Sequence, residues 1–80
     1  MIVIYDPSSD NIEITFNNIN NTPFSIYMID ITGKIVLNEE KTISEADNRL
    51  IINTHNISAG LYNVVIQSDD ILITKRIIIP

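Results

Sequence analysis

The chain has 80 residues, of which 45% are hydrophobic and 19% are charged, and this composition excludes an intrinsically disordered chain. A chain of this length has room for one hydrophobic core, so we expect a single domain over residues 1–80. The net charge of −5 argues against nucleic acid and anionic membrane surfaces as partners, and the absence of cysteine excludes disulfides and cysteine–zinc sites.

Isoleucine dominates the hydrophobic content, with 19 isoleucines against two alanines. A β-branched side chain is stiff in a helix but packs well on the pleated surface of a sheet. Apolar and polar residues alternate with a period of two along most of the chain, and no segment keeps a 3.6-residue apolar pattern over three turns. The sequence therefore predicts strands throughout.

Clusters of turn-forming residues divide the chain into seven expected strands. In chain order they are Ile2–Tyr5, Asn11–Phe16, Phe24–Asp30 (a central strand), Lys34–Glu39, Asn48–Asn53, Leu61–Gln67 and Ile71–Ile79, the last being the longest. The expected connections are Asp6–Asp10, Asn17–Pro23, the hairpin turn Asp30–Lys34, Glu40–Asp47 as a loop or one helical turn, Asn56–Gly60 and Ser68–Asp70. Seven strands with a turn signal every roughly 8–12 residues predict an all-β, immunoglobulin-like antiparallel β-sandwich.

Alternation along these strands places every second side chain on a shared face. The predicted sets are Ile12, Ile14 and Phe16; Phe24, Ile26 and Met28; and Tyr62, Val64 and Ile66. Tyr62 also follows a turn at the start of its strand, as in the tyrosine corner of sandwich domains, so we expect its hydroxyl to bond to upstream backbone. A ligand-binding role for Tyr62 is the alternative.

The residues that catalysis or metal binding would need are few. His55 is the only histidine, Ser58 is the only hydroxyl close downstream, and no Gly-x-Ser-x-Gly elbow is present, so a solvated loop histidine is expected. Asp69–Asp70 with Asp47 or Glu45 are candidate calcium ligands, but the spacing of a calcium loop is absent. We therefore predict no enzyme activity, metal site or cofactor.

The last segment is the one that folding alone explains least. Apart from Lys75, the side chains of one parity are the isoleucines Ile71, Ile73, Ile77 and Ile79, while Leu72 and Ile78 have the opposite parity, beside Thr74 and Arg76. Either a β-bulge re-registers the strand at Lys75 and Arg76, or some apolar side chains face water. Such a strand is a docking surface or, as the residues alone favour, an edge strand whose cations prevent edge pairing.

Four segments carry short motifs that occur together, in the same order, in a known family. Ile4–Asp10 resembles an opening Tyr-Pro-Asn-Pro stretch, and Ile26–Val36 resembles an Asp-x-x-Gly-(Lys/Arg) hairpin. Ile57–Ile66 is similar to the signature Leu-Ser-x-Gly-x-Tyr-x-Val-x-Ile, and Thr74–Ile79 to a closing Thr-Lys-Lys-Ile-Val-Val. Together they resemble the C-terminal sorting domain of cargo proteins of the type IX (Por) secretion system of Bacteroidetes.

The resemblance implies an immunoglobulin-like sandwich that acts as a sorting signal and not as an enzyme. It implies an N-terminally fused cargo that passes from the periplasm across the outer membrane, and two partners, an outer-membrane translocon and a cell-surface sortase. The sortase usually removes the domain and attaches the cargo to lipopolysaccharide, so the cargo is expected to be secreted or bound at the cell surface. By motif matching, the residues recognised by the translocon are Gly60, Tyr62, Lys75, Arg76, Ile77, Ile78 and Ile79.

Other functions stay open at this point. A carbohydrate- or adhesin-type binding module appended to a secreted enzyme needs exposed aromatic side chains, but the chain has no tryptophan and only Tyr5, Phe16, Phe24, Tyr27 and Tyr62. A purely structural spacer is a third option. A weak homodimer through edge strands such as Ile71–Ile79 is a further expectation. Met1–Tyr5 lacks the basic region of a signal peptide, so an export signal is expected on a preceding segment.

Overall fold

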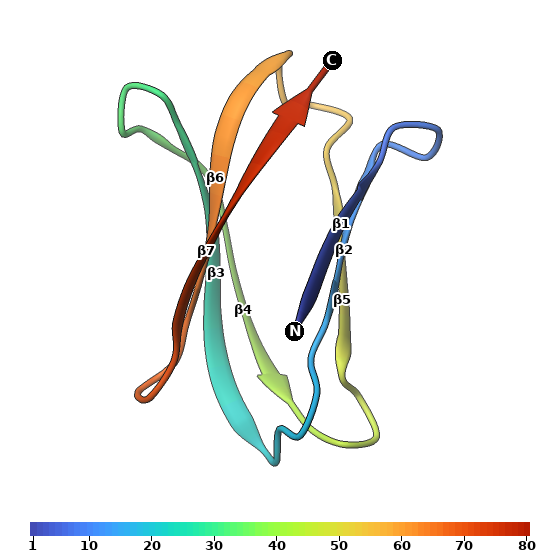
Figure 1. Ribbon diagram of the computed structural model, residues 1–80, viewed down its shortest axis with the longest axis vertical. Coiled ribbons are helices and arrows are strands. Elements are labelled where there is room, and N and C mark those ends of the chain that lie inside the picture. The colour runs from blue at the N-terminus through green and yellow to red at the C-terminus, as the bar shows by residue number, and fades with distance from the viewer.

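The computed structural model describes all residues from 1 to 80 and consists of seven strands in two antiparallel sheets packed face to face (Figure 1). The strands are β1 (Ile2–Asp6), β2 (Asn11–Thr15), β3 (Thr22–Asp30), β4 (Ile35–Ile43), β5 (Arg49–Asn53), β6 (Gly60–Gln67) and β7 (Leu72–Ile79). The predicted immunoglobulin-like antiparallel β-sandwich is therefore confirmed. The structure contains no helix with the length and apolar character that crossing a membrane requires.

One sheet has the order β1-β2-β5 and the other has the order β4-β3-β6-β7. Two pairings join strands that are distant in the chain. Ile14 of β2 lies opposite Leu50 of β5, and Met28 of β3 lies opposite Val64 of β6. The remaining pairings are hairpins between consecutive strands. β3 and β6 are central, so the larger sheet has β4 and β7 as its edges.

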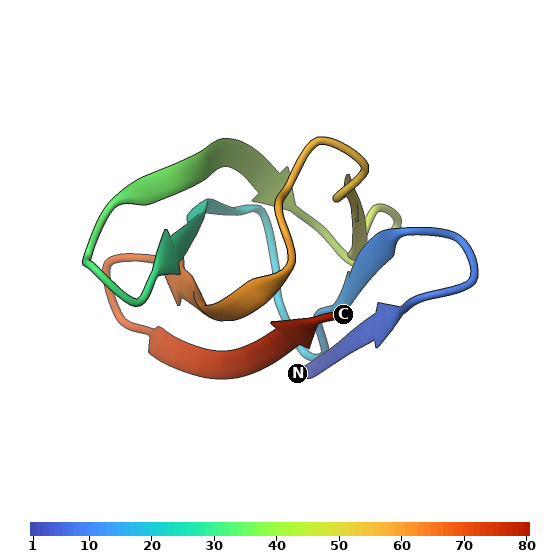
Figure 2. The same cartoon turned by 90° about the horizontal axis from the view of Figure 1, so that it is seen from above.

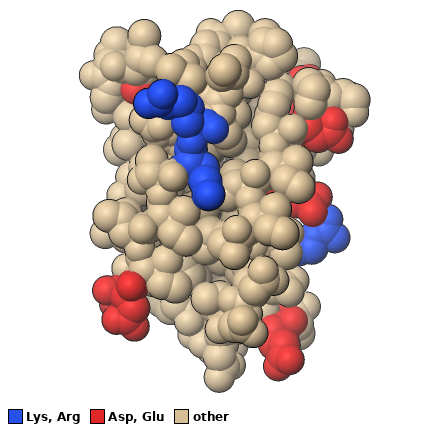
Figure 3. Space-filling view, in the orientation of Figure 1, with Lys and Arg blue, Asp and Glu red and all other residues tan.

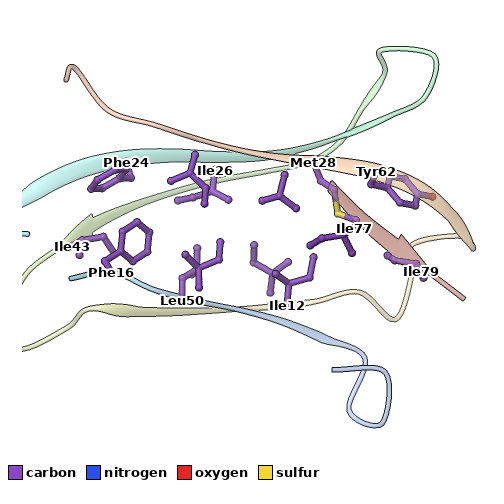
Figure 4. Close-up of a cluster of buried hydrophobic side chains, with 14 residues drawn as sticks. Ile12, Phe16, Phe24, Ile26, Met28, Ile43, Leu50, Tyr62, Ile77 and Ile79 are labelled. Atoms are coloured by element: carbon purple, nitrogen blue, oxygen red, sulfur yellow. The ribbon is translucent and has the colours of Figure 1, made fainter. Parts of the chain in front are cut away.

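The core lies between the two sheets and follows the predicted alternation. Its 14 hydrophobic side chains are Ile12, Ile14, Phe16, Phe24, Ile26, Met28, Ile43, Leu50, Ile52, Tyr62, Val64, Ile66, Ile77 and Ile79. The rings of Phe16 and Phe24 meet with their centroids 4.9 Å apart and tilted by 52°, in the range that favours aromatic pairs (Figure 4). All nine side chains that alternation assigned to shared faces are buried.

The prediction for Glu40–Asp47 is wrong, because half of this segment continues β4. The strand runs to Ile43, whose side chain is fully buried, and the turn begins only at Ser44. Backbone bonds in both directions between Ser44 and Asp47 close that turn, at 3.1 and 3.2 Å. β4 is an edge strand, so its charged side chains can stay in water while its backbone pairs with β3. The polar sequence therefore gave no sign of a strand, although the buried Ile43 fixes its end against the core.

Two further predicted boundaries are wrong. β3 begins at Thr22, so Pro23 lies inside the strand, opposite Thr42. β7 has eight residues and is not the longest strand, since β3 and β4 have nine each. It starts one residue late because the amide of Ser68 donates a 2.8 Å hydrogen bond to the carbonyl oxygen of Ile71, which closes the preceding turn.

Candidate functional site

The four segments that carry the family-like motifs gather at one end of the sandwich. The turn after β1, the hairpin between β3 and β4, the loop before β6 and the C-terminal end of β7 all lie at the top of Figure 1. Three of these segments are fixed locally by side chains that bond to nearby backbone, and the fourth is seated by strand pairing. This end is therefore the part of the molecule to describe in detail.

The carboxylate of Asp30 organises the hairpin between β3 and β4. Its Oδ1 accepts hydrogen bonds from the hydroxyl and amide of Thr32, at 2.6 and 2.9 Å, and from the amide of Lys34 at 3.0 Å. Gly33 completes the turn with φ of +89°, a conformation that side-chain-bearing residues rarely adopt. The Thr32 hydroxyl first, and then the Lys34 amide, lower the pKa of Asp30 below its ordinary value, because both bonds favour the charged form.

The turn after β1 is built in the same way around Asp6. The carboxylate accepts bonds from the Ser8 hydroxyl at 2.7 Å, the Ser8 amide at 3.0 Å and the Ser9 hydroxyl at 3.0 Å. The Ser8 hydroxyl makes the largest contribution, followed by the Ser9 hydroxyl, and together they lower the pKa of Asp6. Both aspartates are therefore turn-forming carboxylates whose acceptor capacity is used locally.

The loop before β6 forms a tyrosine corner. Tyr62 is buried, and its hydroxyl donates a 2.6 Å hydrogen bond to the carbonyl oxygen of Ser58, as predicted. Gly60 has φ of +155°, in the region that favours glycine, and a Cβ at that position would lie 3.5 Å from Cε2 of Tyr62. The corner thus combines a glycine for the backbone path with a tyrosine that holds the loop in place.

The Gly60–Tyr62 corner and the end of β7 are cross-strand partners. Gly60 lies opposite Ile79, and Tyr62 lies opposite Ile77 on one side and Asp30 on the other. Two motifs on consecutive strands, together with the hairpin aspartate, therefore occupy adjacent positions in one sheet. The sequence identified each motif but did not predict this register, because register depends on which strands pair.

β7 keeps an unbroken register with β6, from Gly60 opposite Ile79 to Gln67 opposite Leu72. Of the two alternatives for the Lys75–Arg76 region, the bulge is thereby excluded, and apolar side chains face water instead. The exposed fractions are 68% for Leu72 and 69% for Ile78. β7 pairs with β6 only, so it is an edge strand of the larger sheet.

Lys75 and Arg76 lie at the middle of β7 and point to opposite faces of the sheet. Lys75 is opposite the buried Val64 and so has an inward-facing position, yet it is exposed, and Arg76 is opposite Asn63 on the outer face. Neither cation has a carboxylate within 4.0 Å. Basic side chains accordingly stand over β7 in the space-filling view, with acidic ones toward the periphery (Figure 3).

Comparison with protein families settles what kind of domain this is. The model of the family described as the secretion system C-terminal sorting domain matches residues 4–80. The chain belongs to this family. It is a C-terminal sorting signal for type IX secretion, and the family is not an enzymatic one. A search of curated proteins found no matching sequence.

Membership in the sorting-domain family bears on partners and localisation in general terms. The family implies a cargo fused N-terminally, an interaction with the secretion system, and a protein that is secreted or located at the cell surface. All four motif segments lie within the matched residues, so the family match includes the segments that gather at one end of the sandwich.

The candidate catalytic and calcium-binding residues lie in three connections between strands. His55 is exposed, and its Nδ1 lies 3.8 Å from Oδ2 of Asp10, an ion pair only when the histidine is protonated. No three His, Cys, Asp or Glu side chains gather where one metal ion would contact them all, and the candidate calcium ligands Asp69 and Asp70 belong to the turn before β7.

Nothing in the structure favours a carbohydrate-binding module. Phe16 and Phe24 are buried against each other, and Tyr62 is used in the corner. Tyr27 is half-buried and donates a 2.8 Å hydrogen bond to Gln67 Oε1, and Tyr5 is half-buried against the core. No aromatic ring is left fully exposed for a sugar to stack on.

Proposed function

We propose that the translocon recognises this sorting domain through the free edge of β7. The observation that carries the proposal is that β7 pairs with β6 alone, so the backbone amides and carbonyls along its other edge have no partner strand. Unpaired edges accept an added strand through main-chain hydrogen bonds, and side chains along the strand then supply specificity. Lys75, Arg76 and Ile78 are exposed on this strand and available for that purpose.

The seven residues expected to carry recognition divide into two groups by whether they present an exposed side chain. Those with exposed side chains, which are proposed to contact the translocon directly, are Lys75, Arg76 and Ile78. The others act by holding β7 and its partner strand in place, through the core or the corner, and they are Gly60, Tyr62, Ile77 and Ile79. The side chains of Tyr62, Ile77 and Ile79 are buried and do not touch a partner of the folded domain, and Gly60 is exposed but has no side chain, so the second group consists of positioning residues.

The wider function follows from the same assignment. We propose that residues 1–80 act as one non-enzymatic domain whose N-terminally fused cargo reaches the cell surface through the periplasm and the outer-membrane translocon. A surface sortase then removes the domain and leaves the cargo attached to the outer membrane. Recovery of the cargo with this domain still attached, after surface display in a sortase-competent host, would contradict the cleavage step.

A weak homodimer is proposed at β1 rather than at β7. β1 is the free edge of the smaller sheet, and Ile2 and Ile4 are 52% and 55% exposed on its outer face. Sedimentation equilibrium of the domain is expected to show a mass that rises with concentration, and the Ile4→Lys variant should abolish the rise. A mass that stays monomeric in both proteins would contradict the dimer.

The test of recognition is export of a reporter. A periplasm-exported reporter fused ahead of the domain in a Bacteroidetes host is expected to reach the surface with the native chain but not after deletion of Lys75–Pro80. Because that deletion removes the buried Ile77 and Ile79, a second variant replaces only exposed side chains, with serine at Lys75, Arg76 and Ile78. Its matched control carries serine at Arg49 and Ile51, which are exposed on β5 and lie outside the four motif segments. Equal surface display of all folded variants would refute the proposal.

A further inference from the structure

The two cations of β7 give its free edge a definite charge pattern. Lys75 and Arg76 are adjacent in the middle of the strand, one on each face of the sheet, and neither has an acidic partner. Of the other basic residues, Lys41 is paired with Asp47 at 3.1 Å and Arg49 with Glu13 at 2.8 Å. The edge that the proposed function assigns to recognition is thus basic on both faces.

Pairing of β7 with β7 of a second copy is disfavoured by this pattern. In a two-fold antiparallel pair, residues that lie opposite each other point to the same face of the sheet. Only registers in which one residue lies opposite its own copy meet this condition. The two registers that pair almost the whole strand place Lys75 opposite its own copy or Arg76 opposite its own copy. Like charges directly opposite each other destabilise a strand pair.

The other edge of the same sheet carries the complementary charge, but it is a poorer partner. β4 has Glu39 on its inner face and Glu40 on its outer face. A bulge leaves Val36 without a partner on β3, so the β4 edge is irregular in the half that would lie against Ile77–Ile79. A register that sets Glu39 against Lys75 also sets the charged Lys41 against the apolar Ile73. A second copy would therefore match the charge of Lys75 but not the apolar side chains of β7.

A lipid surface fits this edge less well than a strand does. Electrostatic binding to anionic lipids takes clusters of about 4–8 basic residues, whereas β7 has two and the chain as a whole carries −5. The free edges of β7 and β1 flank the same side of the sandwich, as Figures 1 and 2 show together. Val3 of β1 and Ile73 of β7 are half-buried on this side, so part of each side chain still faces water. A further strand beside β7 would cover that remaining apolar surface.

We propose that β7 is completed by an extended strand of the secretion machinery that places acidic side chains opposite Lys75 and Arg76 and apolar side chains opposite Ile77–Ile79. The inference rests on the proposed function and specifies the chemistry of the partner. Acidic side chains at two adjacent positions of the added strand fall on both faces of the sheet, as the two cations do. The strand is selected by charge at the middle of β7 and by apolar contact at its end.

Peptide binding to the complete domain tests this proposal. The probe is a synthetic peptide with the length of β7, eight residues, in which threonine and valine alternate around two central glutamates, and the control peptide has two lysines instead. NMR titration with amide exchange reports which strand each peptide protects. We expect the glutamate peptide to protect β7 and to bind about five- to tenfold more tightly than the lysine peptide. The preference should reverse in the Lys75→Glu/Arg76→Glu variant and weaken as salt is raised.

Several results would overturn the inference. They are equal binding of the two peptides, protection of a strand other than β7, and no protection by either peptide at about 1 mM. Binding of phosphatidylserine vesicles that is lost in the charge-reversed variant and protects no β7 amide would identify a lipid as the partner. A concentration-dependent mass that Glu39→Lys abolishes would identify a second copy. Loss of reporter export on replacing the exposed β7 side chains, together with no charge preference, would keep the proposed function and remove this inference alone.

Discussion

The hydroxyl of Tyr62 donates a 2.6 Å hydrogen bond to the carbonyl oxygen of Ser58, four residues before it in the chain. The bond fixes the loop that leads from the smaller sheet into β6, so it sets where β6 begins. Because Tyr62 lies opposite Ile77, the same residue also contributes to seating β7. A local bond at the corner is therefore connected to the position of the proposed recognition strand through one pair of neighbouring strands.

Replacing Tyr62 with phenylalanine is expected to lower the free energy of unfolding by about 1 kcal/mol, because the ring stays buried while the Ser58 carbonyl loses its partner. Urea unfolding followed by circular dichroism measures the change. Tyr27→Phe is the control, since it removes the bond to Gln67 at the surface and should change stability by less than about 0.5 kcal/mol. Equal effects of the two substitutions would contradict a structural role of the corner.

Replacing Gly60 with alanine is expected to destabilise the domain by about 1–3 kcal/mol, through backbone strain rather than a clash. The nearest atom to the new Cβ would be 3.5 Å away, which is an ordinary contact, whereas φ of +155° is unfavourable for alanine. Gly33→Ala separates the two causes, since φ there is +89° and no atom lies within 4 Å of the added Cβ. Thermal unfolding should show similar losses for both variants, and a neutral Gly60→Ala would refute the assignment of strain.

Adjacent isoleucines of β7 should separate folding from recognition. Ile77 is 8% exposed and Ile78 is 69% exposed. Ile77→Ala is expected to cost about 2–4 kcal/mol of unfolding free energy, whereas Ile78→Ala should stay within about 0.5 kcal/mol of the native chain. In the reporter assay, Ile78→Ala should reduce surface display without unfolding the domain. Full display of a stable Ile78→Ala variant would remove this residue from the recognition surface.

Stability should fall in acid partly through Asp30. Its pKa is lower in the folded chain than the ordinary value of about 3.9, so folding favours the ionised form. This contribution is fully present above about pH 5 and is lost as the pH falls through the lowered folded-state pKa. An NMR titration of the Asp30 carboxyl checks the direction, and the Asp30→Asn variant should show a shallower loss of stability in acid. Asp69→Asn controls for the loss of one negative charge, and equal slopes in the two variants would contradict the prediction.

The sequence was sufficient for the elements whose signal is local. Alternation of apolar and polar residues predicted all seven strands, although not all their bounds, and the core-facing side chains of β2, β3 and β6, because one face of each sheet is buried against the other. The hairpin at Gly33 and the corner at Tyr62 were also predictable, since each depends on residues within a few positions of one another. The loop at Asn17–Pro23 agrees as well, with Asn18 and Asn21 at positive φ, although β3 starts earlier.

The remaining features depend on tertiary context. The polar end of β4 was predicted as a loop or one helical turn because its residues show no alternation of apolar and polar side chains. An edge strand can carry charged side chains on both faces, but the sequence does not show which strand lies at an edge. The choice between a bulge and exposed isoleucines in β7 was open for a similar reason, since only the register with β6 decides it. The fact that Lys75 and Arg76 lie on a free edge likewise follows from the sheet order, which pairs β3 with β6 across more than thirty residues of sequence.

Because Gly60 pairs with Ile79 and Tyr62 with Ile77, the larger sheet is complete only after the last strand has been synthesised. β7 is the last of the seven strands to leave the ribosome, and it supplies two of the core side chains as well as the open edge. A polypeptide interrupted before Ile77 carries the cargo but neither closes the sandwich nor displays that edge. Under the proposed recognition of β7, the translocon therefore exports only molecules whose translation has passed through all seven strands, so a truncated cargo protein is not exported.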